Sequence, residues 1–94
     1  MMEKKVQSDL IKYLKKKGCY VIKTKPGLGT PVGCPDIFAF YEGWWGAFEV
    51  KATEKSEFQP LQEYTINKLS KWSSAWVVHS GNYQNIISEL EAIL

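Results

Sequence analysis

The spacing of apolar side chains along the chain predicts three helices. Over residues 3–17 apolar positions recur every three or four residues, and Gly18 is expected to end this first helix. A second helix is predicted from about Pro60 to residue 71, because proline fits the first turn of a helix. A third helix is predicted to run to the last residue from Ser80 or Asn82, either of which can cap it.

Four short runs rich in β-branched and aromatic residues predict strands. They cover residues 19–24, 36–41, 45–51 and 75–79. The second and third runs are separated by a three-residue linker with a central glycine, a spacing typical of a hairpin. The last run is almost wholly apolar, as expected of a strand covered on both faces. The crossover through the second helix implies a parallel strand pair. The pattern therefore predicts an α/β fold, a mixed β-sheet flanked by helices, in the order αβββαβα.

Length and composition predict one small domain over residues 1–94. No apolar run approaches the roughly 20 residues needed to span a bilayer. The first ten residues turn polar where a signal peptide needs an apolar stretch. The two cysteines, Cys19 and Cys34, are too few for a disulfide framework or a zinc site. We therefore expect a cytoplasmic protein that does not associate with membranes.

Charge is distributed unevenly along the chain. Every one of the 12 basic residues is a lysine, and eight of them lie in the first 35 residues beside only two acids. This asymmetry suggests a surface for a polyanion such as DNA, although a solvated lysine face on a surface helix explains it equally well. Without arginine the commonest base-specific contact to DNA is missing, so phosphate contacts should dominate any recognition of DNA.

The most informative residues lie at adjoining ends of the predicted hairpin. Asp36 begins one strand, and Glu49 and Lys51 end its partner, so antiparallel pairing brings all three together. Glu49 and Lys51 are two residues apart and therefore leave the same face of the sheet. Carboxylate oxygens are the ligands that Mg²⁺ and Mn²⁺ prefer, and a lysine can orient a water or offset charge on a phosphate. The alternative is that Lys51 forms only a surface salt bridge with Asp36 or Glu49.

Three further polar residues are weaker candidates. Glu3 falls on the apolar stripe of the first helix, where a carboxylate needs a partner, although a frayed helix end in water is an equal interpretation. Gln62 on the second helix can donate to a phosphate or hold a water, but it can equally be an ordinary surface amide. His79, the single histidine, is expected to be structural.

These residues resemble a known family. The run Gly33-Cys34-Pro35-Asp36, the apolar strand after it and the run Phe48-Glu49-Val50-Lys51 are similar to the VRR-Nuc domain, the virus-type replication-repair branch of the PD-(D/E)xK nucleases. The resemblance covers nearly the whole chain and implies a restriction-endonuclease-like core and a phage-type, stand-alone member. The archaeal-type Holliday junction resolvases share the same pattern of Asp followed by Glu-x-Lys and are the family most easily confused with it.

The resemblance implies roles for individual residues. Asp36 and Glu49 would bind Mg²⁺ or Mn²⁺, with Val50 and Glu3 included in the metal site. Lys51 would be the catalytic lysine, Gln62 the helix glutamine and Glu3 an accessory acid. Gln59 competes with Gln62, because the segment before it lacks the glycine often found there. The lysine-rich first helix and the glycine loop would hold the DNA backbone, and the candidates are Lys4, Lys5, Lys12, Lys25, Gly27 and Gly29.

The expected function is a metal-dependent DNA endonuclease that resolves four-way (Holliday) junctions. A junction has two-fold symmetry and the chain offers one site, so cutting both strands calls for a homodimer. Trp44 and Trp45 are candidates for the dimer interface or for stacking on exposed bases, and equally for covering the core. Two alternatives stay open: a nuclease for flaps or plain duplexes, and a non-catalytic DNA-binding module that keeps the fold.

Overall fold

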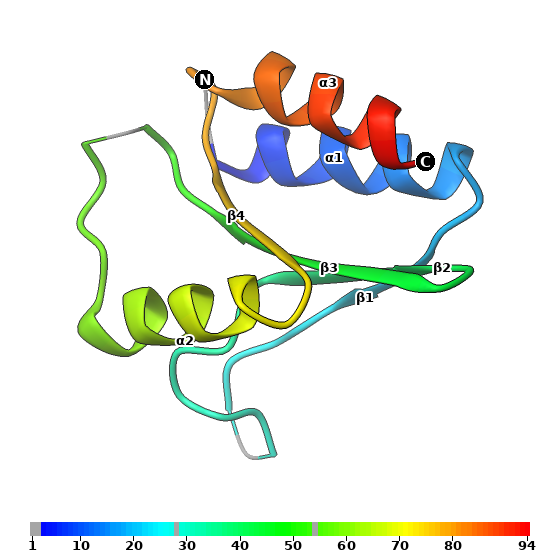
Figure 1. The fold of residues 1–94 in the computed structure, drawn as a ribbon. Coiled ribbons are helices and arrows are strands. Elements are labelled where there is room, and N and C mark those ends of the chain that lie inside the picture. The colour runs from blue at the N-terminus through cyan, green and yellow to red at the C-terminus, as the bar shows by residue number, and fades with distance from the viewer. Residues whose placement is uncertain (1–2, 28, 54) are drawn as a thin grey trace.

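The computed structural model describes residues 3–27, 29–53 and 55–94. Its elements follow the predicted order: α1 (Glu3–Lys16), β1 (Tyr20–Lys23), β2 (Ile37–Tyr41), β3 (Trp44–Val50), α2 (Pro60–Ser70), β4 (Ser74–Val78) and α3 (Tyr83–Ile93). The four strands form one sheet in the order β1-β2-β3-β4 (Figure 1). Pairing is antiparallel between β1, β2 and β3 and parallel between β3 and β4, which confirms the predicted mixed sheet.

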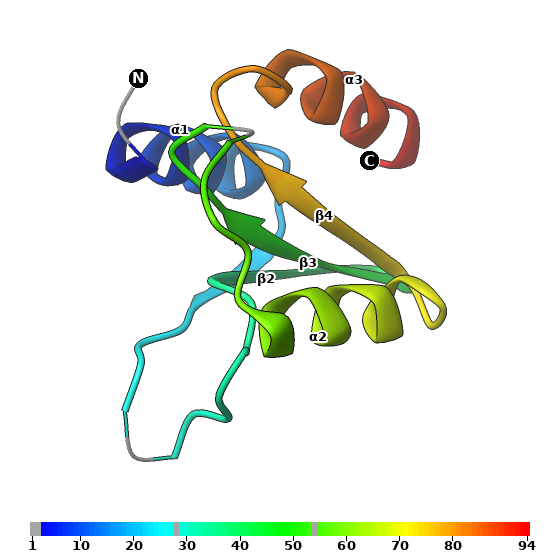
Figure 2. The ribbon, with the colours of Figure 1, turned by 90° about the vertical axis from the view of Figure 1, so that its left-hand side faces the viewer.

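The two faces of the sheet are covered differently. Of the described helices, α1 and α3 lie on one face and α2 lies on the other (Figure 2). The core lies on the α1/α3 face, where the buried stripe Val6, Leu10 and Leu14 packs against strand residues that include Ile37 and Phe48. Burial of such side chains is worth roughly 1.5–3 kcal/mol each, so this face supplies most of the hydrophobic stabilisation. The polar contacts among Glu49, Lys51 and Gln62 lie on the α2 face.

The last strand has helices on both faces, as expected, but it lies at the edge of the sheet. β4 contacts α2 on one face and α3 on the other. The cover is partial, because of its five residues only Val78 is fully buried and the other four are intermediate. Trp44, predicted to lie in the hairpin linker, is the first residue of β3.

Both candidate tryptophans at the hairpin are half-buried. Trp44 packs against the core and its indole N–H donates to the Ser74 hydroxyl at 3.2 Å. The ring of Trp44 also lies 6.4 Å from that of Trp76. These contacts agree with the interpretation in which Trp44 helps to cover the core.

The start of α3 is organised by Asn82. Its side chain accepts a hydrogen bond from the backbone N–H of His79 at 2.8 Å and donates to the Val77 carbonyl at 2.8 Å. The imidazole of His79 accepts from the Gly81 N–H at 3.0 Å, so this histidine has the structural role expected of it. Both cysteines are free. Among the described residues, no helix has the length and apolar character that crossing a membrane requires.

Candidate active site at the adjoining ends of β2 and β3

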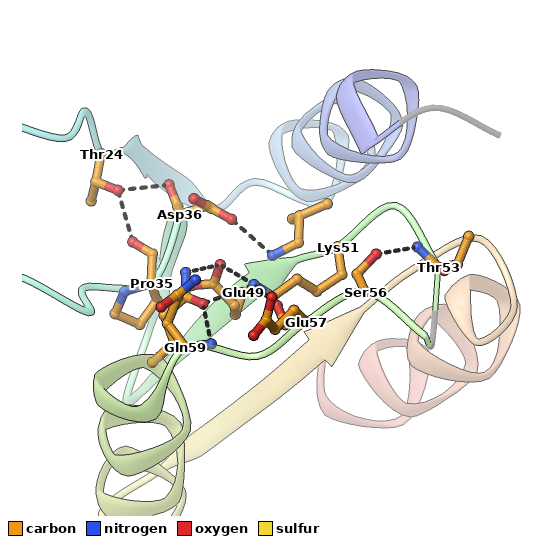
Figure 3. A network of polar contacts seen from close by, with 11 residues as sticks. Thr24, Pro35, Asp36, Glu49, Lys51, Thr53, Ser56, Glu57 and Gln59 are labelled. Atoms are coloured by element: carbon orange, nitrogen blue, oxygen red, sulfur yellow. Dashed lines mark hydrogen bonds and ion pairs between the residues drawn. The ribbon is translucent and has the colours of Figure 1, made fainter.

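The pairing of β2 with β3 places Asp36 beside Glu49. Ile37 lies opposite Phe48, so the residue before β2 faces the residue after Phe48. Asp36 is fixed there because its Oδ2 accepts a hydrogen bond from the Val50 backbone N–H at 2.9 Å. Figure 3 shows the polar side chains gathered at this end of β3. The predicted meeting of the two acids is therefore present.

Glu49 is a buried carboxylate, with only 2% of its surface exposed. Its Oε2 accepts a hydrogen bond from the side-chain amide of Gln62 at 3.0 Å. Its Oε1 is buried and has no hydrogen-bond partner within the described part of the chain. A buried carboxylate oxygen without a partner is costly, so the site favours a ligand that supplies positive charge or a proton.

Lys51 is held close to the acids by several contacts. Its ammonium donates to Gln62 Oε1 at 2.8 Å and to the Glu57 backbone carbonyl at 3.2 Å, and it lies 3.9 Å from Glu49 Oε2. The ammonium also lies 5.3 Å from the centre of the Phe58 ring, a cation–π contact. Only 12% of the side chain is exposed. The lysine charge is thus directed toward the carboxylate pair.

Gln62 connects the lysine to Glu49, and this separates it from Gln59. Gln62 is the third residue of α2, where its Oε1 also accepts from the Gln59 backbone N–H at 3.2 Å. Gln59 itself is exposed at the start of the helix. Of the two glutamines that the sequence left open, Gln62 is the one whose side chain contacts both Glu49 and Lys51.

The environment raises the pKa of Glu49 to about 8. Burial is the main cause, the negative charge of Asp36 acts in the same direction, and Lys51 acts against both. Burial, followed by the charges of Glu49 and Asp36, also raises the pKa of the Cys34 thiol. The site therefore concentrates more negative charge than Lys51 alone can balance.

Thr24, which the sequence analysis did not single out, hydrogen-bonds to the segment around Asp36 and so positions the loop before β2. The Thr24 hydroxyl donates to the Pro35 carbonyl at 2.7 Å, and its backbone N–H donates to the Asp36 carbonyl at 2.8 Å. A cavity of about 380 Å³ lies between this loop and α2, and Thr24, Gly27, Asp36 and Gln62 are among its lining residues. A threonine at the end of a strand carries no signal for this role in the sequence.

Gly33 lets the loop approach α2. Its φ is +83°, and a Cβ added there would lie 2.7 Å from the backbone carbonyl of Leu61. Any side chain at this position would push α2, and with it Gln62, away from the strands. The glycine of the sequence motif is therefore explained by a contact between segments that are far apart along the chain.

The donor set fits a hard divalent cation. It offers the oxygens of Asp36 and Glu49, including the unpartnered Oε1, in a place that is short of positive charge. Within residues 3–27, 29–53 and 55–94, no three His, Cys, Asp or Glu side chains come close enough to hold a metal ion together. One or two carboxylates are the usual protein ligands for Mg²⁺, with water and substrate phosphate completing its shell.

Two other members of the predicted metal site are placed differently. Glu3 is exposed at the first residue of α1, which agrees with the interpretation of a helix end in water and not with that of a buried acid that needs a partner. Its charge is nevertheless near enough to contribute slightly to the raised pKa of Glu49. The side chain of Val50 is buried in the core, so only its backbone can reach the site.

The predicted DNA-binding residues lie in two places, α1 and the loop before β2. Lys4 and Lys12 line a surface hollow of about 410 Å³ together with residues that include Lys15 and Lys23. Lys5 instead forms an ion pair with Asp9 at 2.8 Å. Lys25, Gly27 and Gly29 lie exposed on the loop before β2.

A mixed sheet with an aspartate before one strand and Glu-x-Lys at the end of its partner is the arrangement of the PD-(D/E)xK nuclease superfamily. Among protein families, the model described as archaeal Holliday junction resolvase (Hjc) matches residues 3–81. The chain therefore belongs to this family, the one that the sequence pattern resembled second after the VRR-Nuc domain. Searches of curated proteins and of solved structures found no match. The family assignment supports the nuclease class and the predicted fold.

Proposed function

We propose that this protein is a Mg²⁺- or Mn²⁺-dependent endonuclease that hydrolyses phosphodiester bonds in four-way DNA junctions. The observation that carries the proposal is the pairing of Asp36 with buried Glu49, whose Oε1 has no partner in the described residues, beside the Lys51–Gln62 contact. Membership of the Hjc family supports the junction as substrate.

In this proposal Asp36 and Glu49 hold the cation, with the Val50 carbonyl and Glu3 as additional candidates. When bound, the cation lowers the pKa of water and offsets charge on the phosphate. Lys51 lies on the same face as Glu49 and orients the attacking water or offsets charge that develops on the phosphate. Gln62 keeps the ammonium and the Glu49 carboxylate at a fixed separation, because its amide contacts both.

The reaction itself is a hydrolysis. A water oxygen bonds to phosphorus, one phosphorus–oxygen bond to a sugar breaks, and the leaving oxygen takes up a proton. The hydrogen bonds of Lys51 are to neutral acceptors, the Gln62 amide and the Glu57 carbonyl, and its ion pair with Glu49 is longer, at 3.9 Å. A cation bound to Glu49 would replace the charge of Lys51 there and leave the ammonium available to a phosphate.

A homodimer is part of the proposal, because a four-way junction presents two symmetry-related strands for cutting. The α2 face of β1 and β2 offers a surface for the contact. Tyr20 and Ile22 on β1 and Phe40 on β2 are 71%, 42% and 39% exposed there. Clusters of exposed apolar side chains on a sheet mark interaction sites more often than isolated ones do. The tryptophans of the hairpin are less accessible than these residues.

Finer parts of the sequence interpretation stay predictions: assignment to the VRR-Nuc branch, a phage-type origin, a cytoplasmic location and a nuclease domain that extends over residues 1–94. The family match ends at residue 81, before α3, but Ile86 and Leu90 of that helix belong to the core. We therefore expect removal of α3 to unfold the nuclease.

The proposal is tested by incubating the protein with labelled four-way junction, flap, duplex and single-stranded DNA in Mg²⁺, Mn²⁺ or EDTA. We expect symmetric nicks confined to the junction, dependent on metal, and abolished in Asp36→Asn. Asp9→Asn is the matched control, because it removes a carboxylate on α1 that pairs with Lys5 outside the site.

Each result separates the alternatives. Cutting of flaps or duplex would keep the nuclease and discard the junction. Binding to the junction with no cutting in any metal would identify a non-catalytic DNA-binding module. Full activity in Asp36→Asn would overturn the proposed site.

A further inference from the structure

The outward side of α2 carries an exposed stripe that the proposed reaction does not use. Leu61, Tyr64 and Lys68 are separated by three and four residues, a spacing that places them on one side of the helix. Trp72 lies in the turn just after α2, with its ring beside Lys68. Leu61 is 51%, Tyr64 60% and Trp72 65% exposed. We refer to these four residues as the α2 stripe.

The stripe combines aromatic rings with positive charge. The Lys68 ammonium lies 5.7 Å from the centre of the Tyr64 ring and 5.5 Å from that of Trp72. Lys71 lies beside them and helps to line a hollow of about 370 Å³. Within the described ranges the ion pairs are formed by Lys5, Lys17 and Lys51. Neither Lys68 nor Lys71 therefore has a carboxylate oxygen of that part of the chain within 4 Å. Both charges are therefore available to an anionic ligand.

The first residue of the stripe adjoins the candidate active site. Leu61 of the stripe and Gln62 of the site both line a hollow of about 450 Å³. Lys68 follows Gln62 by six residues of α2, which corresponds to about 9 Å along the helix, and Trp72 lies in the turn after it. Among the helices of the described ranges, α1 and α3 lie on the opposite face of the sheet from α2 (Figures 1 and 2). These two helices therefore do not obstruct a strand of DNA that leaves the site along α2.

We propose that the α2 stripe binds unstacked nucleotides that adjoin the scissile phosphate. Bases stack on Tyr64 and Trp72, and Lys68 between them contacts a phosphate. Aromatic rings interleaved with lysines suit single-stranded nucleic acid, because every base presents a flat face and every linkage a negative charge. The inference rests on the proposed function, since it requires DNA in the neighbouring site.

Charge favours nucleic acid over a second copy of the chain as the occupant. A two-fold contact centred on this side of α2 would bring Lys68 and Lys71 close to the same lysines of the other copy. Such like-charge contacts disfavour association. A DNA strand supplies the opposite charge at each step.

The test measures binding without cleavage, by fluorescence anisotropy in EDTA. The labelled probes are a four-way junction, an oligothymidylate and a blunt duplex. We expect Tyr64→Ala and Trp72→Ala to raise the Kd for junction and oligothymidylate at least about fivefold and to leave duplex binding nearly unchanged. Lys68→Ala should also reduce the slope of log Kd against log salt by about one for those two probes.

Two controls accompany these variants. Trp72→Phe keeps a ring and should bind nearly as wild type does. Tyr41→Ala removes an exposed aromatic side chain from β2, away from α2, and should leave the Kd unchanged. Thermal melting of each variant checks that the fold is retained.

The outcomes distinguish this inference from the proposed function. Wild-type junction binding that Trp72→Ala and Lys68→Ala leave unchanged would overturn the α2 stripe as a DNA site while the nuclease stands. A wild-type protein that binds none of the probes would overturn both. Conversion of a dimer to a monomer by Trp72→Ala, seen by light scattering, would show a contact between copies and also overturn the inference.

Discussion

The amide nitrogen of Gln62 lies 3.0 Å from Glu49 Oε2 and joins the first turn of α2 to the end of β3. Through this hydrogen bond a helix on one face of the sheet sets the position of a buried acid. The same amide group accepts a hydrogen bond from Lys51 through its oxygen, at 2.8 Å. One neutral side chain therefore aligns both charged groups of the candidate site.

Gln62→Ala should lower the cleavage rate about 10- to 100-fold, the usual cost of removing a group that orients a metal ligand. Its effect on the Kd for a junction in EDTA should be small, because Gln62 contacts protein groups. Single-turnover cleavage and anisotropy separate the two quantities. Gln59→Ala is the matched control at the residue just before α2, and a larger rate loss there than in Gln62→Ala would reverse the assignment of the helix glutamine.

Lys51→Ala should lower the rate of cleavage at saturating metal by at least about 100-fold, in the range found when one group that stabilises a transition state is removed. Junction binding should change little, because most of the lysines lie elsewhere on the surface. Lys55→Ala removes an exposed lysine a few residues along and should cut normally. Equal activity of the two variants would exclude Lys51 from the reaction.

The raised pKa of Glu49 predicts how stability depends on pH. Between the ordinary value of 4.5 and about 8 the folded protein keeps a proton that the unfolded chain releases. The metal-free protein should therefore lose stability as pH rises through this interval, and most of the loss should be complete above pH 8. Thermal melting in EDTA from pH 4.5 to 8.5 measures the loss, and Glu49→Gln should make it smaller.

Added Mg²⁺ should counter this loss, because a cation binds the ionised carboxylate and competes with the proton. The rise in Tm on adding Mg²⁺ should accordingly be larger at pH 8 than at pH 5.5, and it should be absent in Glu49→Gln. A rise of equal size at both pH values, or one that persists in Glu49→Gln, would place the metal away from Glu49.

The sequence predicted the fold and the meeting of Asp36 with Glu49 because both depend on local rules. The period of two along strands and the short linker of the hairpin determine which residues face each other. Neither rule chooses between Gln59 and Gln62, which differ by one turn of a helix whose orientation depends on packing with the sheet. The same limit applies to Glu3, because its place on the helical stripe could not decide between a buried acid and the exposed helix end that the structure has.

Contacts between segments that are far apart along the chain could likewise not be predicted from the sequence. The hydrogen bonds of Thr24 to the segment around Asp36 depend on the pairing of β1 with β2, and the tight fit of Gly33 against Leu61 depends on where α2 packs. The apolar run of β4 predicted helices on both faces but not its place at the edge of the sheet, because an apolar run looks the same in an edge strand and in a central one.

Gly33→Ala should destabilise the protein and displace α2. The added Cβ meets the Leu61 backbone at 2.7 Å, in addition to the strain of an alanine at φ +83°. Gly43→Ala is the matched control, because Gly43 also has a positive φ, +70°, but nothing within 4 Å of the added Cβ. Gly43→Ala should cost about 1 kcal/mol and Gly33→Ala measurably more, with a slower cleavage rate as well. If the two variants lowered the Tm equally, the close contact between Gly33 and Leu61 would not explain the need for glycine at position 33.

Dimerisation is tested on the α2 face of β1. Ile22→Glu places a charge among the exposed apolar side chains Tyr20 and Phe40, and burying that charge at an interface would be costly. We expect light scattering to show a dimer for the wild type and a monomer for the variant, and we expect the monomer to lose coordinated cutting of both junction strands. Ile93→Glu introduces the same charge at a 41% exposed position on α3, across the sheet, and should stay dimeric. A dimer that survives Ile22→Glu but not Ile93→Glu would move the interface to the opposite face.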